Sequence, residues 1–477
     1  MNRFDHFFVD NQWVRATGSA EIDVVNPATE RVVARLRGCS AADVHRAVSS
    51  AQAGLATWSR STLAERKQAL VKLRAALERR QDAFATALAE EMGAPLWISK
   101  LLHLPMPLNN LSAIAAGMDQ IAWEETMGNA LVVREPVGVV AGLTPWNAPI
   151  HQIVAKLGGT IAAGCSLVLK TSEITPSVGR LFFDAVAECG LPPGVVNMVW
   201  GDAPVGVALT AHPGVDMVSF TGSDAVGKQV MAGAAAQLKR LALELGGKSA
   251  ALVLDDADLD TAIPAVVRQS MANSGQTCVC QSRLLVPRAL LARAEQAAAD
   301  FARQLRLGDP FDADTRLGPV ATRSQLERIR GLIELTASEG GRLVAGDAQR
   351  PAGLLAGHYI EPTIISQVRA DMRLAQQEVF GPVLAIMPYD DEAQGVQIAN
   401  STPYGLSGAV WSSDPQRAAR VARQLRTGQV VLNGAAQNLA APFGGFGYSG
   451  FGRENGRFSI LGFLELKSIQ GAACPAS

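Results

Sequence analysis

The sequence lacks the features that mark exported and membrane-inserted proteins. Its six cysteines are few for 477 residues and irregularly spaced, unlike a disulfide framework. The first six residues, MNRFDH, include acidic and amide side chains where a signal peptide carries an apolar block. The apolar stretch between Lys156 and Lys170 is shorter than the roughly 20 residues that a membrane-spanning helix needs. We therefore expect a cytoplasmic protein with no membrane partner.

The sequence also lacks an excess of charge of either sign. Lys and Arg number 43 and Asp and Glu number 44, so the formal net charge of −1 gives no support to a nucleic-acid partner. Hydrophobic residues make up 48% of the chain and charged residues 18%, proportions that exclude a disordered chain. At roughly 150 residues per domain, a chain of 477 residues is expected to form two or three domains.

The middle of the chain alternates short apolar runs with helical patterns. The apolar runs cover residues 137–143, 166–169, 195–199, 217–220 and 241–244. The helical patterns lie between them, at about 149–163, 177–188, 204–211 and 225–237. This alternation predicts a parallel sheet with helices on both faces. Ligands of such sheets bind beyond the carboxyl ends of the strands.

A second series of apolar runs begins after Gly246 and Gly247. It covers residues 250–254, 283–287 and 383–387 and predicts a second α/β domain over residues 247–435. The expected fold class is therefore α/β, with two doubly wound parallel-sheet domains. The seam between them is the expected active cleft.

Three short motifs match familiar binding sites only in part. Residues 222–228 resemble a P-loop, but Gln229 stands where Ser or Thr would hold magnesium. Residues 445–450 have the letters of the dinucleotide motif GxGxxG, but they follow no clear strand and open no helix, so we expect a glycine-rich loop. The segment Cys278-Val279-Cys280 has no second cysteine pair and no clustered histidines near it, so we expect no metal site.

Two polar residues have settings that suggest chemistry. Cys278 follows the small and polar run 273–277, and Glu244 ends a predicted strand, where its carboxylate would face the cleft. A nucleophilic cysteine needs a lowered pKa or a base nearby, because the thiolate is the reactive form. The alternatives are an inert buried cysteine and a solvated acid at a strand end. Neither residue decides between these interpretations alone.

Together with four further motifs, these residues resemble the aldehyde dehydrogenase superfamily. The motifs follow the family's order and spacing over essentially the whole chain. They are residues 144–147 (TPWN), 170–173 (KTSE), 220–223 (FTGS), 244–248 (ELGGK), 275–278 (GQTC) and 378–382 (EVFGP), with 442–445 and 449–454 near the end. Six motifs in register are far more specific than any one of them.

The resemblance implies an assignment of domains. It implies a dinucleotide-binding domain from residues 1–120 and 138–246, a catalytic domain from 247–435, and an oligomerisation element from 121–137 and 455–477. A homodimer or homotetramer is expected. The strand-like segment 463–467 is expected to add to the sheet of a partner subunit.

The resemblance also implies an enzyme that oxidises an aldehyde to the carboxylic acid and reduces NAD. Cys278 would attack the aldehyde to form a thiohemiacetal, and loss of a hydride would leave a thioester. The side-chain amide of Asn147 and the backbone N–H of Cys278 would hold the oxyanion. Glu244 would activate the water that hydrolyses the thioester. Lys156 and Glu454 match positions thought to support proton movement, and a structural ion pair is the alternative.

Most of the implied cofactor residues lie in the same motifs. They are Thr144, Pro145, Trp146, Lys170, Ser172, Glu173, Gly201, Gly222, Ser223, Leu245, Gly246, Glu378 and Phe380. Lys170 and Glu173 match the positions that bind the adenosine ribose. A carboxylate accepts hydrogen bonds from ribose hydroxyls but repels a 2′-phosphate, which favours NAD, with NADP as the alternative. Ser223 and the helix after it would face the pyrophosphate. For Phe380, a place in the core is a competing interpretation.

The resemblance places four residues along a substrate tunnel. They are Gln152, Ala155, Val279 and Phe443. Ala155 is small where bulkier residues are common, which suggests room for a larger or aromatic aldehyde. No arginine or paired basic residue obviously marks a substrate that carries a carboxylate.

Other functions remain open at this point. A CoA-acylating semialdehyde dehydrogenase resolves the same thioester with CoA, but such relatives generally lack the general base that Glu244 supplies. A catalytically silent homologue is disfavoured, because Cys278, Glu244, Asn147 and Glu378 are all present. A phosphorylating mechanism is weaker still, because no histidine accompanies Cys278 in the sequence.

Overall fold

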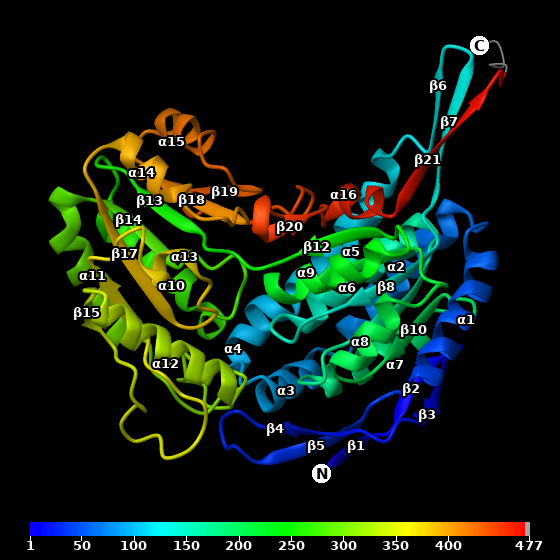
Figure 1. Cartoon of the computed structure of the whole chain (residues 1–477), viewed down its shortest axis with the longest axis horizontal. Coiled ribbons are helices and arrows are strands. Elements are labelled where there is room, and N and C mark those ends of the chain that lie inside the picture. The colour runs from blue at the N-terminus through cyan, green and yellow to red at the C-terminus, as the bar shows by residue number, and fades with distance from the viewer. Residues whose placement is uncertain (473–477) are drawn as a thin grey trace.

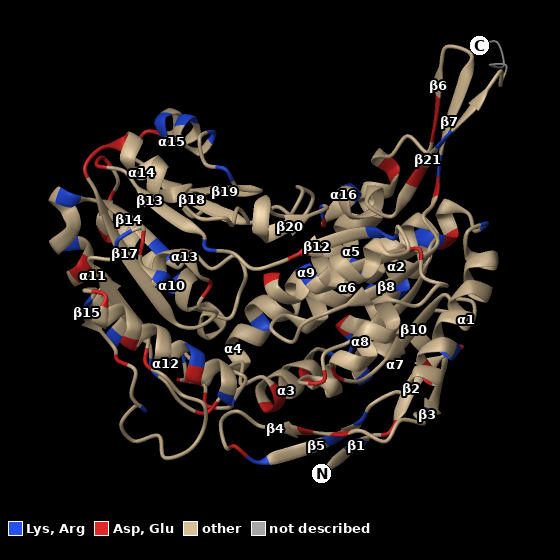
Figure 2. Cartoon of the chain, in the orientation of Figure 1, with Lys and Arg blue, Asp and Glu red and all other residues tan. Residues whose placement is uncertain are grey.

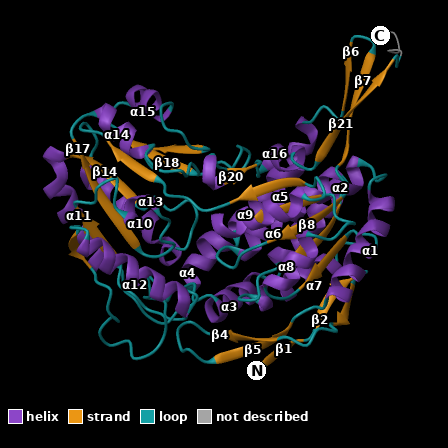
Figure 3. Cartoon of the chain, in the orientation of Figure 1, coloured by secondary structure: helices purple, strands orange, loops and turns teal. Residues whose placement is uncertain are grey.

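Most strands of the chain fall in two large sheets, as the computed structural model of residues 1–472 shows (Figure 1). One sheet has eight strands in the order β20-β12-β11-β8-β9-β10-β2-β3, and the other has seven in the order β15-β16-β17-β14-β13-β18-β19. Helices pack on both large sheets (Figure 3). The predicted α/β class with two parallel-sheet units is confirmed.

The eight-stranded sheet has a parallel centre. Its parallel strands are β8 (Val139–Leu143), β9 (Ser166–Lys170), β10 (Val196–Val199), β11 (Met217–Thr221) and β12 (Arg240–Glu244). The intervening helices are α6 (Pro149–Ala163), α7 (Pro176–Ala187), α8 (Ala203–Thr210) and α9 (Asp224–Ala235). Antiparallel additions at the edges are β2 (His6–Val9), β3 (Gln12–Arg15) and β20 (Gly450–Phe451). β20 comes from a stretch that the sequence prediction assigned to no domain.

The N-terminal region adds a small sheet and a layer of helices. The small sheet consists of β1 (Asn2–Phe4), β5 (Val32–Arg37) and β4 (Glu21–Val25). The helices are α1 (Ala41–Trp58), α2 (Leu63–Glu78), α3 (Gln81–Glu91), α4 (Leu96–Ile98), the π-helix η1 (Ser99–His103), α5 (Pro105–Gly117) and η2 (Met118–Gln120). Capping boxes begin α1 and α2, in which Ser40 pairs with Asp43 and Thr62 with Glu65, so backbone N–H groups of their first turns are satisfied.

The seven-stranded sheet is buried on both faces, with one apolar cluster on each. Its strands are β13 (Ala250–Val253), β14 (Arg283–Pro287), β15 (Arg342–Ala345), β16 (Thr363–Ser366), β17 (Val383–Tyr389), β18 (Ser407–Trp411) and β19 (Gln429–Leu432). Its helices are α10 (Leu259–Met271), η3 (Ala272–Gly275), η4 (Arg288–Leu290), α11 (Leu291–Arg303), α12 (Arg323–Ser338), α13 (Arg373–Gln376), α14 (Glu392–Ala399) and α15 (Pro415–Ala422). Continuous burial explains why the sequence of these strands reads as unbroken apolar runs.

A three-stranded antiparallel arm projects from the body of the molecule (Figure 1). It consists of β6 (Glu124–Met127), β7 (Ala130–Pro136) and β21 (Leu464–Gln470), which follows α16 (Gly456–Leu461). β21 is an edge strand, and all its residues after Leu464 are exposed. Residues 473–477 of the predicted oligomerisation element lie outside the described residues.

Charged residues of both signs lie mainly on the helices and loops around the two large sheets, whose strands carry few of them (Figure 2). No helix within residues 1–472 is both long enough and apolar enough to cross a bilayer.

The predicted glycine-rich loop at 445–450 forms a short 3-10 turn, η5 (Gly447–Ser449), that leads into β20.

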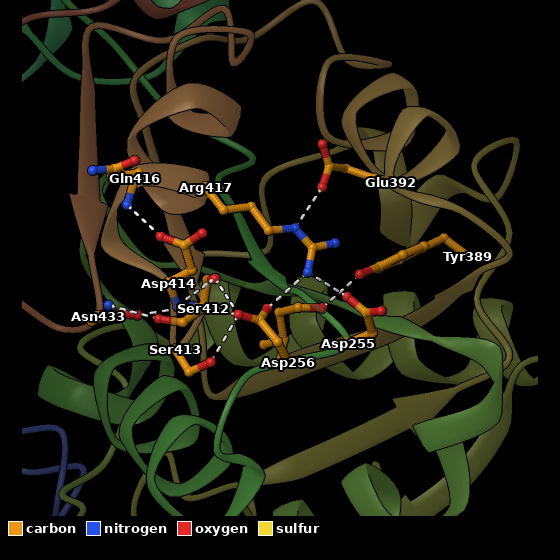
Figure 4. Close-up of polar contacts among 11 residues, drawn as sticks. Asp255, Asp256, Tyr389, Glu392, Ser412, Ser413, Asp414, Gln416, Arg417 and Asn433 are labelled. Atoms are coloured by element: carbon orange, nitrogen blue, oxygen red, sulfur yellow. Dashed lines mark hydrogen bonds and ion pairs between the residues drawn. The ribbon is translucent and has the colours of Figure 1, made fainter.

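A partly buried arginine, Arg417, joins three segments of the seven-stranded unit through ion pairs (Figure 4). Arg417 on α15 places Nη1 2.6 Å from Asp255 and 3.0 Å from Asp256, and Nε 2.9 Å from Glu392 on α14. Burial opposes ionisation of Asp256, but hydrogen bonds from the two serines at 412–413 and the charge of Arg417 outweigh it, so its pKa is lowered. The three carboxylates thus depend on one cation.

We predict that Arg417→Gln lowers the melting temperature, because three carboxylates then face one another without a cation. We expect a loss of about 1–3 kcal/mol, since Arg417, Asp256 and Glu392 are half-buried, although Asp255 is exposed. The loss is expected at neutral pH and to shrink under acid, because a carboxylate with a lowered pKa stabilises the fold above its unfolded pKa and loses that effect as the pH falls through its folded pKa. Arg420→Gln, on the exposed face of the same helix, is the control in differential scanning calorimetry. Equal melting temperatures for both variants would contradict the prediction.

Candidate active site

The carboxyl ends of the strands in the eight-stranded sheet open onto a cavity of about 210 Å³ that also receives residues of the second unit. Its lining comprises Pro145, Trp146, Asn147, Gln152, Thr221, Gly222, Ser223, Glu244, Leu245, Gly246, Cys278, Gln325, Arg328, Glu378 and Phe380. The structure therefore brings Cys278, Glu244 and Asn147 together with most of the predicted cofactor residues. These predicted catalytic and cofactor residues come from five separate stretches of the sequence.

Cys278 lies on a loop that is held firmly by its neighbours. The loop leaves α10 through η3, in which Asn273 and Ser274 have φ of 52° and 54°, a conformation that non-glycine residues seldom adopt. Asn147 Nδ2 donates to the Gln276 carbonyl at 2.9 Å, and Asn273 Nδ2 donates to the Asn147 carbonyl at 2.9 Å. These two bonds fix the amide of Asn147 beside the loop that carries the thiol, and Asn147 keeps its second amide N–H for the cavity.

The Cys278 thiol has a pKa well above the ordinary range. Burial is the main cause, and the carboxylates of Glu378 and Glu244 add to it. A buried group beside two acids resists becoming negative. The lowered pKa that would favour a nucleophile is therefore absent in the protein alone, and a base or a nearby positive charge has to supply the difference.

Glu244 ends β12 and is almost fully buried, with 4% of its surface exposed. Burial raises its pKa well above the ordinary value, and the charge of Glu454 raises it further. Neither carboxylate oxygen has a hydrogen-bond partner among the described residues. Gly444 makes room for this side chain, because a Cβ at that position would lie 2.7 Å from Glu244 Oε1. Glu244 is thus a cavity carboxyl group with a raised pKa and with no hydrogen-bond partner for its oxygens among the described residues.

Lys156 and Glu454 form a buried ion pair behind the cavity. Lys156 Nζ lies 3.2 Å from Glu454 Oε1 and donates to Thr221 Oγ1 at 2.7 Å. Lys156 has no exposed surface, and the carboxylate of Glu454 lies close enough to influence Glu244. The structure is consistent with both interpretations of this pair, as a structural contact and as a path for protons.

The opposite side of the cavity is built for close approach of a ligand. Ser223 is the N-cap of α9, and its Oγ accepts from Val226 N at 3.3 Å, which leaves the positive end of the helix facing the cavity. Gly247 N donates to Glu378 Oε1 at 3.0 Å. Burial raises the pKa of Glu378 to about 7.

Trp146 and Phe380 form an aromatic wall of the cavity. Their ring centroids lie 5.7 Å apart at 85°. Phe380 has a φ of 55°, which is costly for a bulky residue and persists only where the surroundings impose it. It lines the cavity and is only half-buried, so it is not a core residue.

The remaining predicted cofactor residues lie outside the enclosed cavity. Lys170 ends β9, and its Nζ lies 3.1 Å from Glu173 Oε2. Ser172 accepts a hydrogen bond from Ile174 N at 3.2 Å. Thr144 follows β8, where its N–H donates to the Lys170 carbonyl at 3.1 Å. Residue 201 is a glycine with φ of 142°, packed on Val205. These residues lie at or just after the carboxyl ends of β8, β9 and β10 in the eight-stranded sheet.

Of the four predicted tunnel residues, only Gln152 lines the cavity. Ala155 is fully buried, with its carbonyl accepting from Ser459 Oγ at 3.0 Å. Val279 is half-buried beside Cys278, and Phe443 exchanges backbone hydrogen bonds with Glu454. The room that we expect at Ala155 for a larger aldehyde therefore stays a prediction.

Sequence reasoning missed two polar residues of the cavity, Gln325 and Arg328 on α12. Gln325 Nε2 donates to the carbonyls of Val379 and Phe380, and Arg328 donates to the carbonyl of Glu378. Arg328 is therefore a basic residue of the cavity that the sequence analysis did not identify. No motif surrounds these positions, and only their spacing of three on one helix face could have linked them.

A histidine also approaches the catalytic loop, as the sequence could not show. His103 Nε2 lies 3.3 Å from Asn273 Oδ1, and burial lowers its pKa to about 4. His151 on α6 lies nearby, and burial lowers its pKa as well. Both imidazoles are neutral at pH 7, and His103 contacts the loop through Asn273 rather than through Cys278.

We predict that Glu378→Gln accelerates modification of Cys278 by iodoacetamide at pH 7–8. Removal of a negative neighbour lowers the raised pKa of the thiol, so a larger fraction is thiolate, and Gln can still accept from Gly247 N. A rate increase of several-fold is expected, as roughly one pKa unit changes the thiolate fraction about tenfold. Peptide mapping by mass spectrometry measures the rate at Cys278, with Glu334→Gln, on the exposed face of α12, as the control. An unchanged or slower rate would refute the prediction.

The chain matches the aldehyde dehydrogenase family over residues 13–469. It is 46% identical to a 3-succinoylsemialdehyde-pyridine dehydrogenase of Pseudomonas sp., over 99% of each chain. Among solved structures, it is similar to a mutant of aldehyde dehydrogenase C from Pseudomonas syringae in complex with NAD+ and octanal, with 41% identity, a TM-score of 0.97 and coverage of 99% and 98%.

A second solved structure agrees with the first. It is an aldehyde dehydrogenase of Mycobacterium tuberculosis in complex with NAD+, with 39% identity, a TM-score of 0.96 and coverage of 98% of both chains. The family match spans nearly the whole length, and the relatives are matched over nearly their whole length. The chain therefore belongs to the aldehyde dehydrogenase family.

Proposed function

We propose that the protein oxidises an aldehyde to its carboxylic acid with NAD, by way of a thioester on Cys278. The observation that carries this proposal is that Cys278, Asn147 and Glu244 line one cavity, opposite Glu378 and the N-terminus of α9. The two similar solved structures contain NAD+, and one contains octanal as well.

The residues of the site fit a dinucleotide. Gly246 faces Glu378 so closely that a Cβ would collide with the carboxylate, which leaves space only for backbone. The cap of α9 and Arg328 offer positive charge for a pyrophosphate, and Glu378 offers acceptors for ribose hydroxyls. The enclosed volume of about 210 Å³ is below the roughly 300–1,000 Å³ of whole-ligand pockets, so it suits the reacting end. When bound, NAD would supply a hydride acceptor that carries a positive charge.

In the proposed mechanism, Cys278 Sγ attacks the aldehyde carbon and its proton passes to Glu244 or to water. The amide of Asn147 and the backbone N–H of Cys278 donate to the oxyanion, and one such donor is typically worth about 2.7–4 kcal/mol. After the hydride has left, Glu244 takes a proton from the water that attacks the thioester. A carboxyl group with a raised pKa suits this step, because a base works best near the operating pH. The Lys156–Glu454 pair is placed to accept the proton next.

The CoA-acylating alternative is disfavoured by the position of Glu244. Its free oxygens face the same cavity as Cys278, where they can activate water. A silent homologue would have no need to keep three charged or ionisable groups buried together, since such burial costs stability. No cluster of three or more metal-ligating side chains occurs within residues 1–472.

We propose a bulky aldehyde as the substrate. The Pseudomonas relative is named for a pyridine-bearing semialdehyde, and the Pseudomonas syringae structure contains an eight-carbon aldehyde. Gln152 and the aromatic pair Trp146 and Phe380 supply a flat, largely apolar wall. Arg328 donates to the backbone of Glu378, so it is engaged in the cofactor side of the cavity.

We further propose that the protein is a cytoplasmic homodimer or homotetramer that forms through the arm. β21 has its hydrogen-bonding edge free on one side within the described chain, and a free edge pairs readily with another strand. The division into a dinucleotide-binding unit (1–120 and 138–246), a catalytic unit (247–435) and the arm belongs to the same proposal. It is supported by the two large sheets, which share no strand.

The central test is NADH formation at 340 nm with NAD and a panel of aldehydes, without CoA. We expect wild type to turn over, Cys278→Ala to be inactive, and Glu244→Gln to release a burst of NADH and then slow by about 10²–10⁴-fold, the usual contribution of a general base. Full activity in Cys278→Ala would disprove the nucleophile. Turnover only after addition of CoA would establish the acylating alternative instead.

We predict that Glu173→Gln raises kcat/KM for NADP relative to NAD by about tenfold. A carboxylate at this position repels a 2′-phosphate, and its removal is worth roughly 1.4 kcal/mol in the ratio. Asp23→Asn is the matched control, because Asp23 and Glu173 line the same second cavity between β4 and the segment after β9. If both variants keep the wild-type ratio of the two cofactors, Glu173 does not set the preference.

A further inference from the structure

A separate cavity of about 360 Å³ lies where α4 meets α10 and α11 (labelled in Figure 1). Its lining is Trp97, Arg268, Met271, Ala272, Phe301, Gln304, Leu305, Arg316 and Leu317. It shares no residue with the cavity that contains Cys278. Its size falls within the range of small-molecule sites.

The polar groups of this cavity are donors almost throughout. Arg268 and Arg316 are exposed at its rim, and no ion pair joins either guanidinium to a carboxylate within residues 1–472. Arg316 Nη1 donates to the carbonyls of Ala313 at 2.9 Å and Thr315 at 3.3 Å, and its Nε and Nη2 have no hydrogen-bond acceptor within residues 1–472. No acidic residue lines the cavity. The surplus of positive charge and N–H donors favours an anion.

Trp97, which lines the cavity, has an unsatisfied indole N–H group. Its indole Nε1 is buried and has no hydrogen-bond partner among the described residues. A buried N–H group without a partner costs about 1–3 kcal/mol unless a ligand or a water satisfies it.

The remaining walls are apolar and flat. Phe301 and Trp97 present their rings, and the guanidinium of Arg268 lies over Phe301 at 5.2 Å from its centroid, while that of Arg316 lies over Trp97 at 5.9 Å. Met271, Leu305 and Leu317 complete the surface. A planar aromatic body suits such a surface, because it stacks on the rings and on the guanidinium planes.

We propose that this cavity binds a carboxylate carried on an aromatic ring, with the carboxylate between Arg268 and Arg316. The cavity also touches the catalytic loop, because Met271 and Ala272 line it and Asn273, the next residue, donates to the carbonyl of Asn147. A bound acid therefore stiffens the segment that positions Cys278. The binding does not depend on the proposed reaction. The link between this binding and the reaction does depend on the proposed function, because oxidation of an aromatic aldehyde yields an acid of this class.

The test is isothermal titration calorimetry of the full-length protein with benzoate. We expect one site, with affinity reduced by about tenfold or more in Arg268→Gln and in Arg316→Gln, since each change removes a charge-assisted donor. Arg303→Gln is the matched control, because Arg303 is an exposed arginine on α11 that pairs with Asp300 outside the cavity. Benzamide, which has the ring without the charge, is expected to bind at least about tenfold more weakly than benzoate. Both rim arginines are exposed, so their substitution leaves the fold intact.

Two further measurements keep this proposal distinct from the proposed function. Asn147→Ala is expected to leave benzoate binding unchanged, whereas loss of binding in that variant but not in Arg268→Gln would place benzoate in the catalytic cavity and overturn the proposal. Trp97→Phe is expected to weaken binding and to remove the fluorescence change that benzoate causes in wild type. Absence of any heat with wild type, or equal binding of benzoate and benzamide, would also overturn it. These outcomes stand whether or not the enzyme produces NADH.

Discussion

Two adjacent glycines at the crossing between the large sheets are the constraint on which the site depends. Gly246 and Gly247 follow Leu245, the first residue after Glu244 at the end of β12, and the chain then enters the second unit at β13. A Cβ on Gly246 would collide with the Glu378 carboxylate, and one on Gly247 would lie 2.6 Å from the Cys278 carbonyl. Only bare backbone allows groups of both units to meet here. Glu244, the thiol of Cys278 and Glu378 share one cavity because these two residues have no side chains.

That close approach has an electrostatic consequence. Glu244, Glu378 and Cys278 are three acids in one poorly hydrated space, and all three have raised pKa values. The charge of Lys156 lowers the pKa of Glu244, but burial and the charge of Glu454, the ion-pair partner of Lys156, outweigh it. The site resists holding more than one negative charge, which keeps the thiol protonated and unreactive until positive charge lies beside it. Raised pKa values of this kind are typical of functional sites and destabilise the fold that carries them.

The sequence predicted the parts of this structure that follow from local pattern. The alternation of apolar runs and helices predicted the strands from β8 to β12 and the helices between them, and α6 matches its predicted range of 149–163. The motifs predicted Cys278, Glu244 and Asn147, which the cavity brings together. What the sequence could not show depends on long-range packing. β20 returns from near the C-terminus to the edge of the first sheet, and Gln325 and Arg328 reach the cavity from a helix without a motif. Ala155 is fully buried, with its carbonyl accepting from Ser459 Oγ, and its place along a tunnel stays a prediction.

The burial of the thiol bears on the order in which the proposed reaction proceeds. A cysteine that ionised readily in the free protein would be open to oxidation and alkylation at all times. Here burial and two carboxylates hold the thiol neutral, while Asn147 and the Gln276 carbonyl hold the loop in place before any ligand arrives. The geometry is therefore set in advance, and only the charge is missing. A group that brings positive charge to the wall formed by Trp146 and Phe380 would complete the nucleophile. That order, cofactor before aldehyde, ties the reactivity of Cys278 to the presence of the hydride acceptor.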